Sequence, residues 1–256
     1  MRSRHINIYS CLVLSLLGLL ASNLAAEPPI FKPQRVLFIG NSYTEHMRPC
    51  LMAMLDNSPW KQSHFEFITH SGMRLEQHLA DKSTLDKIHS GQWDKVVLQE
   101  YSRLPALTTT KESFQASVTQ FSQAIRQAGA KPILYMTWGR RDGDAENQAA
   151  LPDFTTMQHQ LTAAYQTAAE HNQAEIVPVG LVWSEVRDKD AILGKELYAA
   201  DGSHPSPKGS CLAAAVFLHD LFAADLTTEQ RPTALNSKEW DLIRLAVSEV
   251  DHSLSP

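Results

Sequence analysis

Two short segments far apart in the sequence together hold a serine, a histidine and an aspartate. Residues 40–44 read GNSYT, and residues 201–205 read DGSHP. A carboxylate three residues before a histidine can orient the imidazole within one turn, while the other ring nitrogen faces a nucleophile on a different loop. We therefore predict that Ser42 is a nucleophile, that His204 is its general base and that Asp201 orients the base.

Each of these residues also has an ordinary structural interpretation. Ser42 follows an apolar run and could cap the next helix with its hydroxyl group. His204 could be a surface histidine in a proline-containing turn, and Asp-Gly is a common turn pair, so Asp201 could serve the turn alone. The combined order of the two segments is what favours catalysis.

That order resembles the SGNH, or GDSL-like, hydrolase superfamily. The family's first block is a strand followed by Gly-Asp-Ser, which reads Gly-Asn-Ser at 40–42 here, and its last block is Asp-x-x-His before the final helix. The resemblance covers most of the chain after residue 34. It is nearest to a subgroup of SGNH-like proteins with Gly-Asn-Ser in the first block and Val-Val-Leu-Gln-Glu in the third. It implies a serine esterase that forms an acyl-enzyme on Ser42 and uses no cofactor.

The same resemblance implies an oxyanion hole made by three blocks. The backbone N–H groups of Ser42 and Gly72 match donors of blocks one and two. The third block departs from the family, because no asparagine follows the apolar run that ends at residue 98. We expect the Gln99 amide to replace it, with Ser102 as the second candidate. The alternative is that Gln99 merely ends a strand.

The chain after residue 34 alternates apolar runs with amphipathic segments, which predicts an α/β fold with a parallel sheet covered on both faces. We expect strands near 35–39, 64–69, 94–99, 132–137 and 175–179, each followed by a helix. The resemblance implies a flavodoxin-like, three-layer α/β/α arrangement with strand order 2-1-3-4-5. Such a sheet gathers the predicted site at the carboxyl ends of its strands.

The sequence begins like an exported protein. Arg2 and Arg4 precede an apolar run at 11–21, and the small residues Ala25 and Ala26 follow it. This is the layout of a secretory signal peptide over residues 1–26. An uncleaved anchor is the alternative, although the run is short for a membrane-spanning helix. Residues 27–256 suit a single SGNH hydrolase-like domain in the periplasm or outside the cell.

The charge balance argues against nucleic acid and membrane partners. The net charge is −5, and residues 1–26 hold two arginines and no acid, so their removal would leave −7. His64 and His70, with Glu66 between them, fall on one face of the second predicted strand. Ordinary polar residues of a strand face explain them better than a metal site does. We expect neither a metal nor a cofactor, and the sequence does not fix the oligomeric state.

The sequence indicates the substrate less clearly than the reaction. Trp138, Arg140 and Arg141 follow the fourth predicted strand, where an aromatic ring and two guanidinium groups could bind a sugar together with an anionic group. A solvated loop is an equally good interpretation. Export favours an extracytoplasmic ester, such as an O-acylated saccharide, as the substrate.

Three other functions stay open. An acyltransferase of the same fold would pass the acyl group to a sugar hydroxyl instead of water. A non-catalytic carbohydrate-binding protein could keep the fold, although it would not need Ser42, His204 and Asp201 together. A phosphate-binding flavodoxin-like module would use the turn at 40–44, but that turn has one glycine and no lysine.

Cysteine positions predict a disulfide. Outside the signal peptide two cysteines remain: Cys50, eight residues after Ser42, and Cys211, seven residues after His204. In a 2-1-3-4-5 sheet with right-handed crossovers the first and last helices pack side by side, so the cysteines should lie level with each other. We predict a Cys50–Cys211 bridge; two buried, reduced thiols are the alternative.

Overall fold

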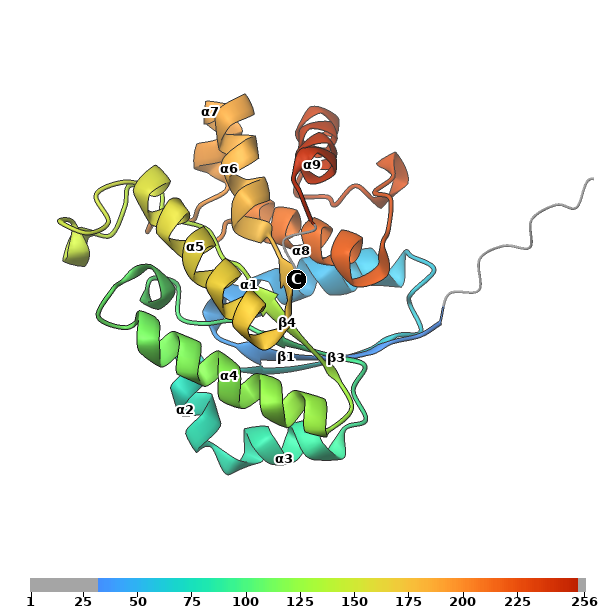
Figure 1. Ribbon diagram of the computed structural model, residues 1–256. Helices are drawn as coiled ribbons and strands as arrows, with labels where there is room; N and C mark the ends of the chain where they lie inside the picture. The colour runs from blue at the N-terminus through green and yellow to red at the C-terminus, as the bar shows by residue number, and fades with distance from the viewer. Residues whose placement is uncertain (1–31, 253–256) are drawn as a thin grey trace, which may run out of the picture. The chain divides into compact units, whose positions relative to one another are not determined.

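The computed structural model describes residues 32–252, and the predicted signal peptide lies outside them. Five parallel strands form one sheet of order β2-β1-β3-β4-β5, which confirms the predicted fold (Figure 1). The strands are β1 (Arg35–Gly40), β2 (His64–Thr69), β3 (Lys95–Leu98), β4 (Lys131–Tyr135) and β5 (Glu175–Val177). Within the described residues, no helix combines the length and the apolar character that crossing a membrane requires.

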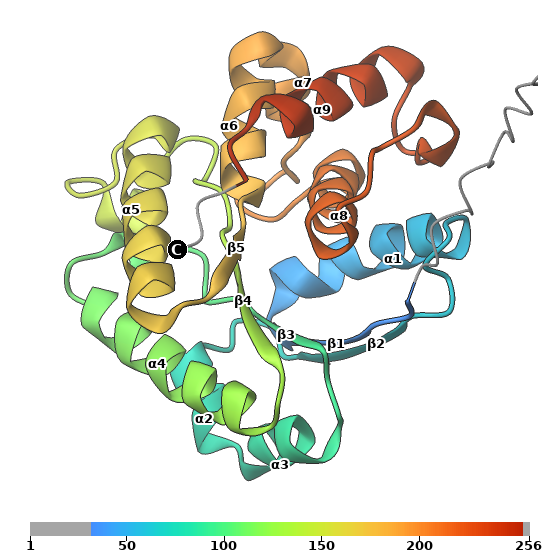
Figure 2. The same ribbon diagram turned by 45° about the vertical axis from the view of Figure 1, so that its right-hand side comes forward.

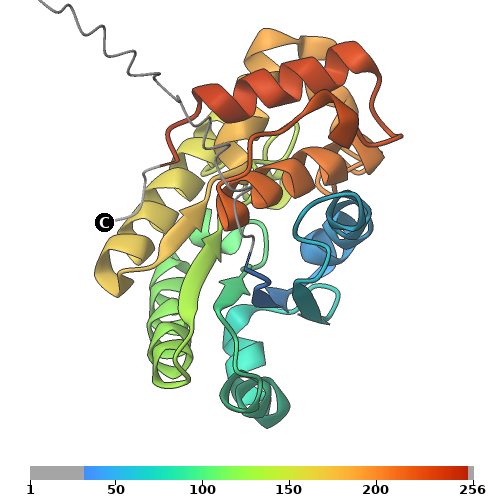
Figure 3. The ribbon, with the colours of Figure 1, turned by 90° about the vertical axis from the view of Figure 1, so that its right-hand side faces the viewer.

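Helices cover both faces of the sheet (Figure 2). One face packs against α1 (Ser42–Asp56), α6 (Val179–Lys189) and α8 (Pro207–Phe222), with α7 (Ala191–Glu196) following α6. The other face packs against α2 (Leu75–Ala80), α3 (Lys82–Ser90), α4 (Lys111–Gln127) and α5 (Phe154–Asn172). The last helix, α9 (Ser237–Glu249), lies outside α8, farther from the sheet (Figure 3).

The middle of β1 shows why its sequence is continuously apolar. Val36 and Phe38 belong to the core beneath α1 and α8, whereas Leu37 and Ile39 belong to the core beneath α2 and α4. Successive side chains of a strand point to opposite faces, so a strand buried on both faces needs no polar residues. Hydrophobic burial on both sides therefore fixes the strand that leads into Ser42.

Two helices follow β5. We expected one helix after the fifth strand, and α6 and α7 together occupy most of the segment from 180 to 200. The helical pattern of α6 is present in the sequence, because Val179, Val182, Trp183 and Val186 recur at the three- and four-residue spacing of a helix and are all buried. Strand ends differ from the expected ones by one or two residues at β1, β3, β4 and β5, and those of β2 agree.

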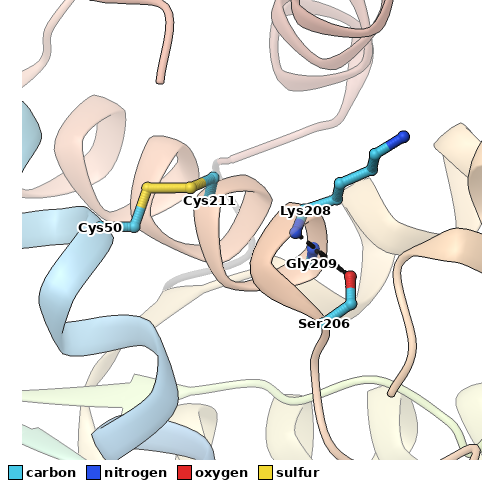
Figure 4. Close-up of a disulfide and its surroundings, with 5 residues drawn as sticks. All are labelled: Cys50, Ser206, Lys208, Gly209 and Cys211. Atoms are coloured by element: carbon cyan, nitrogen blue, oxygen red, sulfur yellow. Dashed lines mark hydrogen bonds between the residues drawn. A yellow bond between two sulfur atoms is a disulfide. The ribbon is translucent and has the colours of Figure 1, made fainter. Parts of the chain in front are cut away.

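The start of α8 places the histidine segment. Ser206 is the N-cap, and its hydroxyl oxygen accepts hydrogen bonds from the N–H groups of Lys208 at 3.1 Å and Gly209 at 3.2 Å (Figure 4). Pro207 occupies the first turn, where its missing N–H is not needed. The cap makes α8 begin three residues after His204, so the histidine lies on the last turn before a buried helix.

A disulfide joins the first and last site-bearing helices. Cys50 of α1 and Cys211 of α8 are bonded, with their Cα atoms 5.4 Å apart (Figure 4). Ser42 begins the first of these helices and His204 shortly precedes the second. The bridge therefore ties together the two elements whose relative position sets the distance between nucleophile and base.

Removal of this bridge should destabilise the protein. The bond closes a loop across 161 residues, so we expect Cys50→Ser with Cys211→Ser to lower the free energy of unfolding by about 2–4 kcal/mol. Urea unfolding of the double variant and of oxidised wild type measures the difference. Equal stabilities, or two alkylatable thiols in unreduced wild type, would contradict the bridge.

Candidate active site

The three predicted catalytic residues lie in one hydrogen-bonded row. The Ser42 hydroxyl oxygen is 2.9 Å from Nε2 of His204, and Nδ1 of the same ring is 2.5 Å from Oδ2 of Asp201. If Nδ1–H donates to the carboxylate, Nε2 has a free lone pair for the serine proton. The row is thus arranged for removal of a proton from Ser42.

Asp201 supports both the ring and the turn. Its Oδ1 accepts from the N–H groups of Ser203 at 2.9 Å and His204 at 3.0 Å, while Oδ2 accepts from the ring. Burial works against its ionisation, but these three hydrogen bonds outweigh it and lower the pKa of Asp201 to about 2. The carboxylate is therefore charged at any pH at which an esterase of this kind would work.

An aromatic stack holds the histidine turn. Trp138 lies between Tyr43, with ring centroids 4.6 Å apart, and Trp183, at 4.0 Å, both nearly parallel to it. Its indole N–H donates to the Ser203 carbonyl, and the Tyr43 hydroxyl lies 2.7 Å from the Ser203 hydroxyl. The stack thus contacts the residue next to His204 through two hydrogen bonds.

The stack corrects the expectation for Trp138. We predicted that its ring binds a sugar, but the side chain is 0% exposed and both of its faces are covered. A ring that is stacked on both sides cannot meet a substrate. Trp138 positions the histidine turn instead, and Tyr43, to which we assigned no function from the sequence, is its partner in this role.

The two arginines after Trp138 differ from each other. Arg140 forms an ion pair at 2.9 Å with Asp144, whose side chain is fully buried, and Arg103 approaches the same carboxylate. This pairing fixes the loop, so the expected substrate contact of Arg140 is not supported. Arg141 donates its backbone N–H to the Gly202 carbonyl, and its side chain pairs with Asp142 beside the Asp201 turn.

Two backbone N–H groups are available as oxyanion donors. Ser42 is the first residue of α1, and the first N–H groups of a helix have no acceptor within it. Gly72 has a φ of +71°, which favours glycine, and its N–H has no partner among the described residues. The loop after β2 is tied to the Ser42 turn, because the Asn41 amide donates to the Met73 carbonyl at 3.0 Å.

Gln99 is placed differently from the expected third donor. Its amide oxygen accepts from the Asn41 N–H and from the Thr44 hydroxyl, each at 2.9 Å, and its amide nitrogen donates to the Glu100 carbonyl. The side chain is 0% exposed. Gln99 therefore lies beneath the Gly-Asn-Ser turn and supports it, so its assignment to the oxyanion hole is corrected.

Gly40 makes this support possible. A Cβ atom at Gly40 would lie 2.7 Å from the Gln99 amide oxygen and 2.6 Å from the Thr44 hydroxyl oxygen. Any other residue would push the amide away from the turn. Ser102, the second candidate donor, is also buried at 5% exposure.

Glu100 joins the loop that contains Gly72 to the loop that follows β3. Its Oε1 accepts from the N–H groups of Tyr101 at 2.6 Å and Leu75 at 3.3 Å. Burial raises the pKa of Glu100 to about 7, although both hydrogen bonds favour the charged form. Nothing in the sequence marks Glu100 for this role, because its burial is visible only in the structure.

One potential metal-binding cluster exists among the described residues, and it lies away from Ser42. Candidate ligand atoms of His219, Asp220 and His252 are within 4.8 Å of one another. They line a cavity with residues of β5, at the opposite ends of the strands from the catalytic row. On β2, Nε2 of His64 pairs with Glu66 at 2.9 Å.

Comparisons with known proteins agree with this geometry. A structure assigned to the SGNH hydrolases from Slackia heliotrinireducens is 32% identical and has a TM-score of 0.62; the match covers 74% of this chain and all of that one. The chain belongs to the SGNH hydrolases. No family model and no curated protein matches it.

Two more distant structures share the SGNH hydrolase fold with this chain. One is a DUF4886 family protein from Bacteroides uniformis, with 17% identity, a TM-score of 0.66, and coverage of 84% of this chain and 93% of that one. The other is a catalytic mutant of an acetylxylan esterase from Geobacillus stearothermophilus, with 16% identity, a TM-score of 0.57, and coverage of 74% and 94%. At this identity they support the fold alone.

The raised pKa of Glu100 predicts how stability changes with pH. A carboxyl group that titrates near 7 when folded and near 4.5 when unfolded binds its proton more tightly in the folded state. Its contribution to stability therefore falls as the pH rises from about 4.5 to 7. Glu100→Gln keeps an amide oxygen as acceptor but removes this titration.

We expect the free energy of unfolding of Glu100→Gln, relative to wild type, to increase by up to about 3 kcal/mol between pH 5 and pH 8. Urea unfolding of both proteins at the two pH values measures this change. A difference between variant and wild type that does not depend on pH would show that Glu100 has an ordinary pKa.

Proposed function

We propose that the protein is an exported serine esterase that hydrolyses an O-acyl ester through an acyl-enzyme on Ser42. The observation that carries the proposal is the hydrogen-bonded row of Ser42, His204 and Asp201, at 2.9 and 2.5 Å. Membership of the SGNH hydrolases supports the reaction class. The amino-terminal sequence supports export.

The geometry supports a two-step reaction. His204 takes the Ser42 proton at Nε2 as the serine oxygen attacks the ester carbonyl carbon, and Asp201 stabilises the imidazolium. The carbonyl oxygen becomes an oxyanion, for which the N–H groups of Ser42 and Gly72 are the available donors. Loss of one such donor typically lowers turnover by about 100- to 1000-fold.

Collapse of the tetrahedral intermediate breaks the ester bond, and His204 gives its proton to the departing alcohol oxygen. Water then loses a proton to Nε2 and attacks the acyl carbon. The second intermediate releases the carboxylic acid, and the proton returns to the Ser42 oxygen. The His204 imidazole accepts and returns the proton in each step, so these proton transfers need no second acid or base.

An O-acylated saccharide is the substrate class that we propose. Several structures with the same fold are named as acetylxylan or acetyl-xylooligosaccharide esterases. A protein exported from the cell would meet such polymers, and the net charge of −5 does not favour a polyanionic substrate. Acetylated xylo-oligosaccharides are therefore the first natural-type substrates to assay.

Replacement of Ser42 by alanine tests the reaction class. We expect Ser42→Ala to lower kcat/KM for 4-nitrophenyl acetate by at least about a thousandfold, because nucleophile and base act as a unit. Asp201→Asn should lower it less, since the serine and the ring remain. Ser248→Ala, an exposed serine on α9, is the matched control. Wild-type turnover in folded Ser42→Ala would refute the proposal.

A further inference from the structure

A cavity of about 450 Å³ begins beside the catalytic histidine. Pro205, the residue after His204, lines its near end together with His46. The His46 ring lies one helical turn beyond Ser42 on α1, with its centroid 5.2 Å from that of His204. The cavity therefore starts next to the reacting atoms, between α1 and the start of α8.

The cavity continues along α1 into a second one of about 340 Å³. Both are lined by the Cys50–Cys211 disulfide, Pro49 and Ala234. We call the two together the α1 groove. The far end is polar: Asn57, Gln230 and Thr233 line it, together with one acidic and one basic residue, Glu229 and Arg231. From His46 to Asn57 the helix rises about 16 Å, so the groove is much longer than an acetyl group.

The position of the α1 groove identifies the half of the ester that it can hold. His204 protonates the departing alcohol oxygen, so the alcohol portion must lie on the histidine side of the reacting carbon. The oxyanion faces the N–H groups of Ser42 and Gly72 instead. Because the α1 groove opens beside His204 and His46, it is placed for the alcohol portion rather than for the acyl chain.

We propose that the α1 groove binds the alcohol portion of the ester as an extended, uncharged saccharide chain. This proposal rests on the proposed esterase function. Prolines and the disulfide offer apolar surface to the C–H faces of sugar rings, and the polar residues at the far end can pair with hydroxyl groups. A long alkyl alcohol would leave those polar groups without partners, which is unfavourable.

His46 fits the role of a hydroxyl-binding group at the entrance. Burial, and then the nearby His204, lower the pKa of His46, so its ring is neutral near pH 7. A neutral imidazole both donates and accepts a hydrogen bond, as a sugar hydroxyl also does. At the point where the first sugar would lie, the groove thus offers this neutral imidazole beside the Glu45 carboxylate, which lines the same cavity and can accept hydrogen bonds from hydroxyl groups.

The test is a comparison of short and long alcohol portions with a blocked groove. Ala234→Trp places a large ring where the two cavities meet, and Ala53→Trp narrows only the far one. Ala116→Trp is the matched control, because Ala116 is an exposed residue of α4 on the opposite face of the sheet. The substrates are 4-nitrophenyl acetate, acetylated glucose, acetylated cellotetraose and dodecyl acetate.

For wild type and Ala116→Trp, we expect kcat/KM to be at least about tenfold higher on the tetrasaccharide than on the monosaccharide. A tenfold ratio corresponds to about 1.4 kcal/mol of additional binding free energy from the longer saccharide. Ala234→Trp should remove this gain, and Ala53→Trp should reduce it. Both should hydrolyse 4-nitrophenyl acetate within about twofold of wild type, which also shows that they fold.

Two results would overturn the inference while leaving the esterase intact. One is normal 4-nitrophenyl acetate hydrolysis with no preference for the longer saccharide. The other is a higher kcat/KM on dodecyl acetate, without a higher one on the tetrasaccharide, that is lost in Ala234→Trp. The groove would then hold an alkyl chain. Failure of the proposed function itself looks different, because folded wild type would then hydrolyse none of the four esters.

Discussion

The hydrogen bond between Ser42 and His204 is the contact on which the site depends, and its two partners come from opposite ends of the chain. Ser42 begins α1 and His204 shortly precedes α8, so the 2.9 Å distance is set by how these helices pack. Packing on a shared face of the sheet brings them together, and the disulfide adds a covalent tie. A shift of α8 along α1 would separate nucleophile from base without disturbing either element.

The turns that carry these residues are supported from below by groups that never meet a substrate. Gln99 accepts hydrogen bonds from the Ser42 turn, and Trp138 holds the carbonyl beside His204. Both side chains are fully buried, so each is fixed by packing as well as by its hydrogen bonds. This arrangement is what catalysis by prearranged groups requires, because a loosely held serine or imidazole would lose its alignment.

Sequence patterns could predict the sheet and the catalytic row because both depend on residue type and order. A strand buried on both faces must be apolar throughout, and a Ser–His–Asp row of this kind needs its serine directly after the first strand and its aspartate and histidine just before a helix. The direction of a single side chain is not fixed in this way. Gln99 follows its strand as expected, but it points beneath the turn because Gly40 on the neighbouring strand leaves that space open. Trp138 turns inward because Tyr43 and Trp183 cover its two faces.

Covalent labelling with a fluorophosphonate is the most direct test of the catalytic row, since the reagent reacts with a serine that is activated by a neighbouring base. We expect one label per chain on native wild type, located at Ser42 by peptide mass mapping, and very slow labelling of folded His204→Ala. Labelling at a different residue, or equally fast labelling of His204→Ala, would contradict the claim that Ser42 and His204 act together.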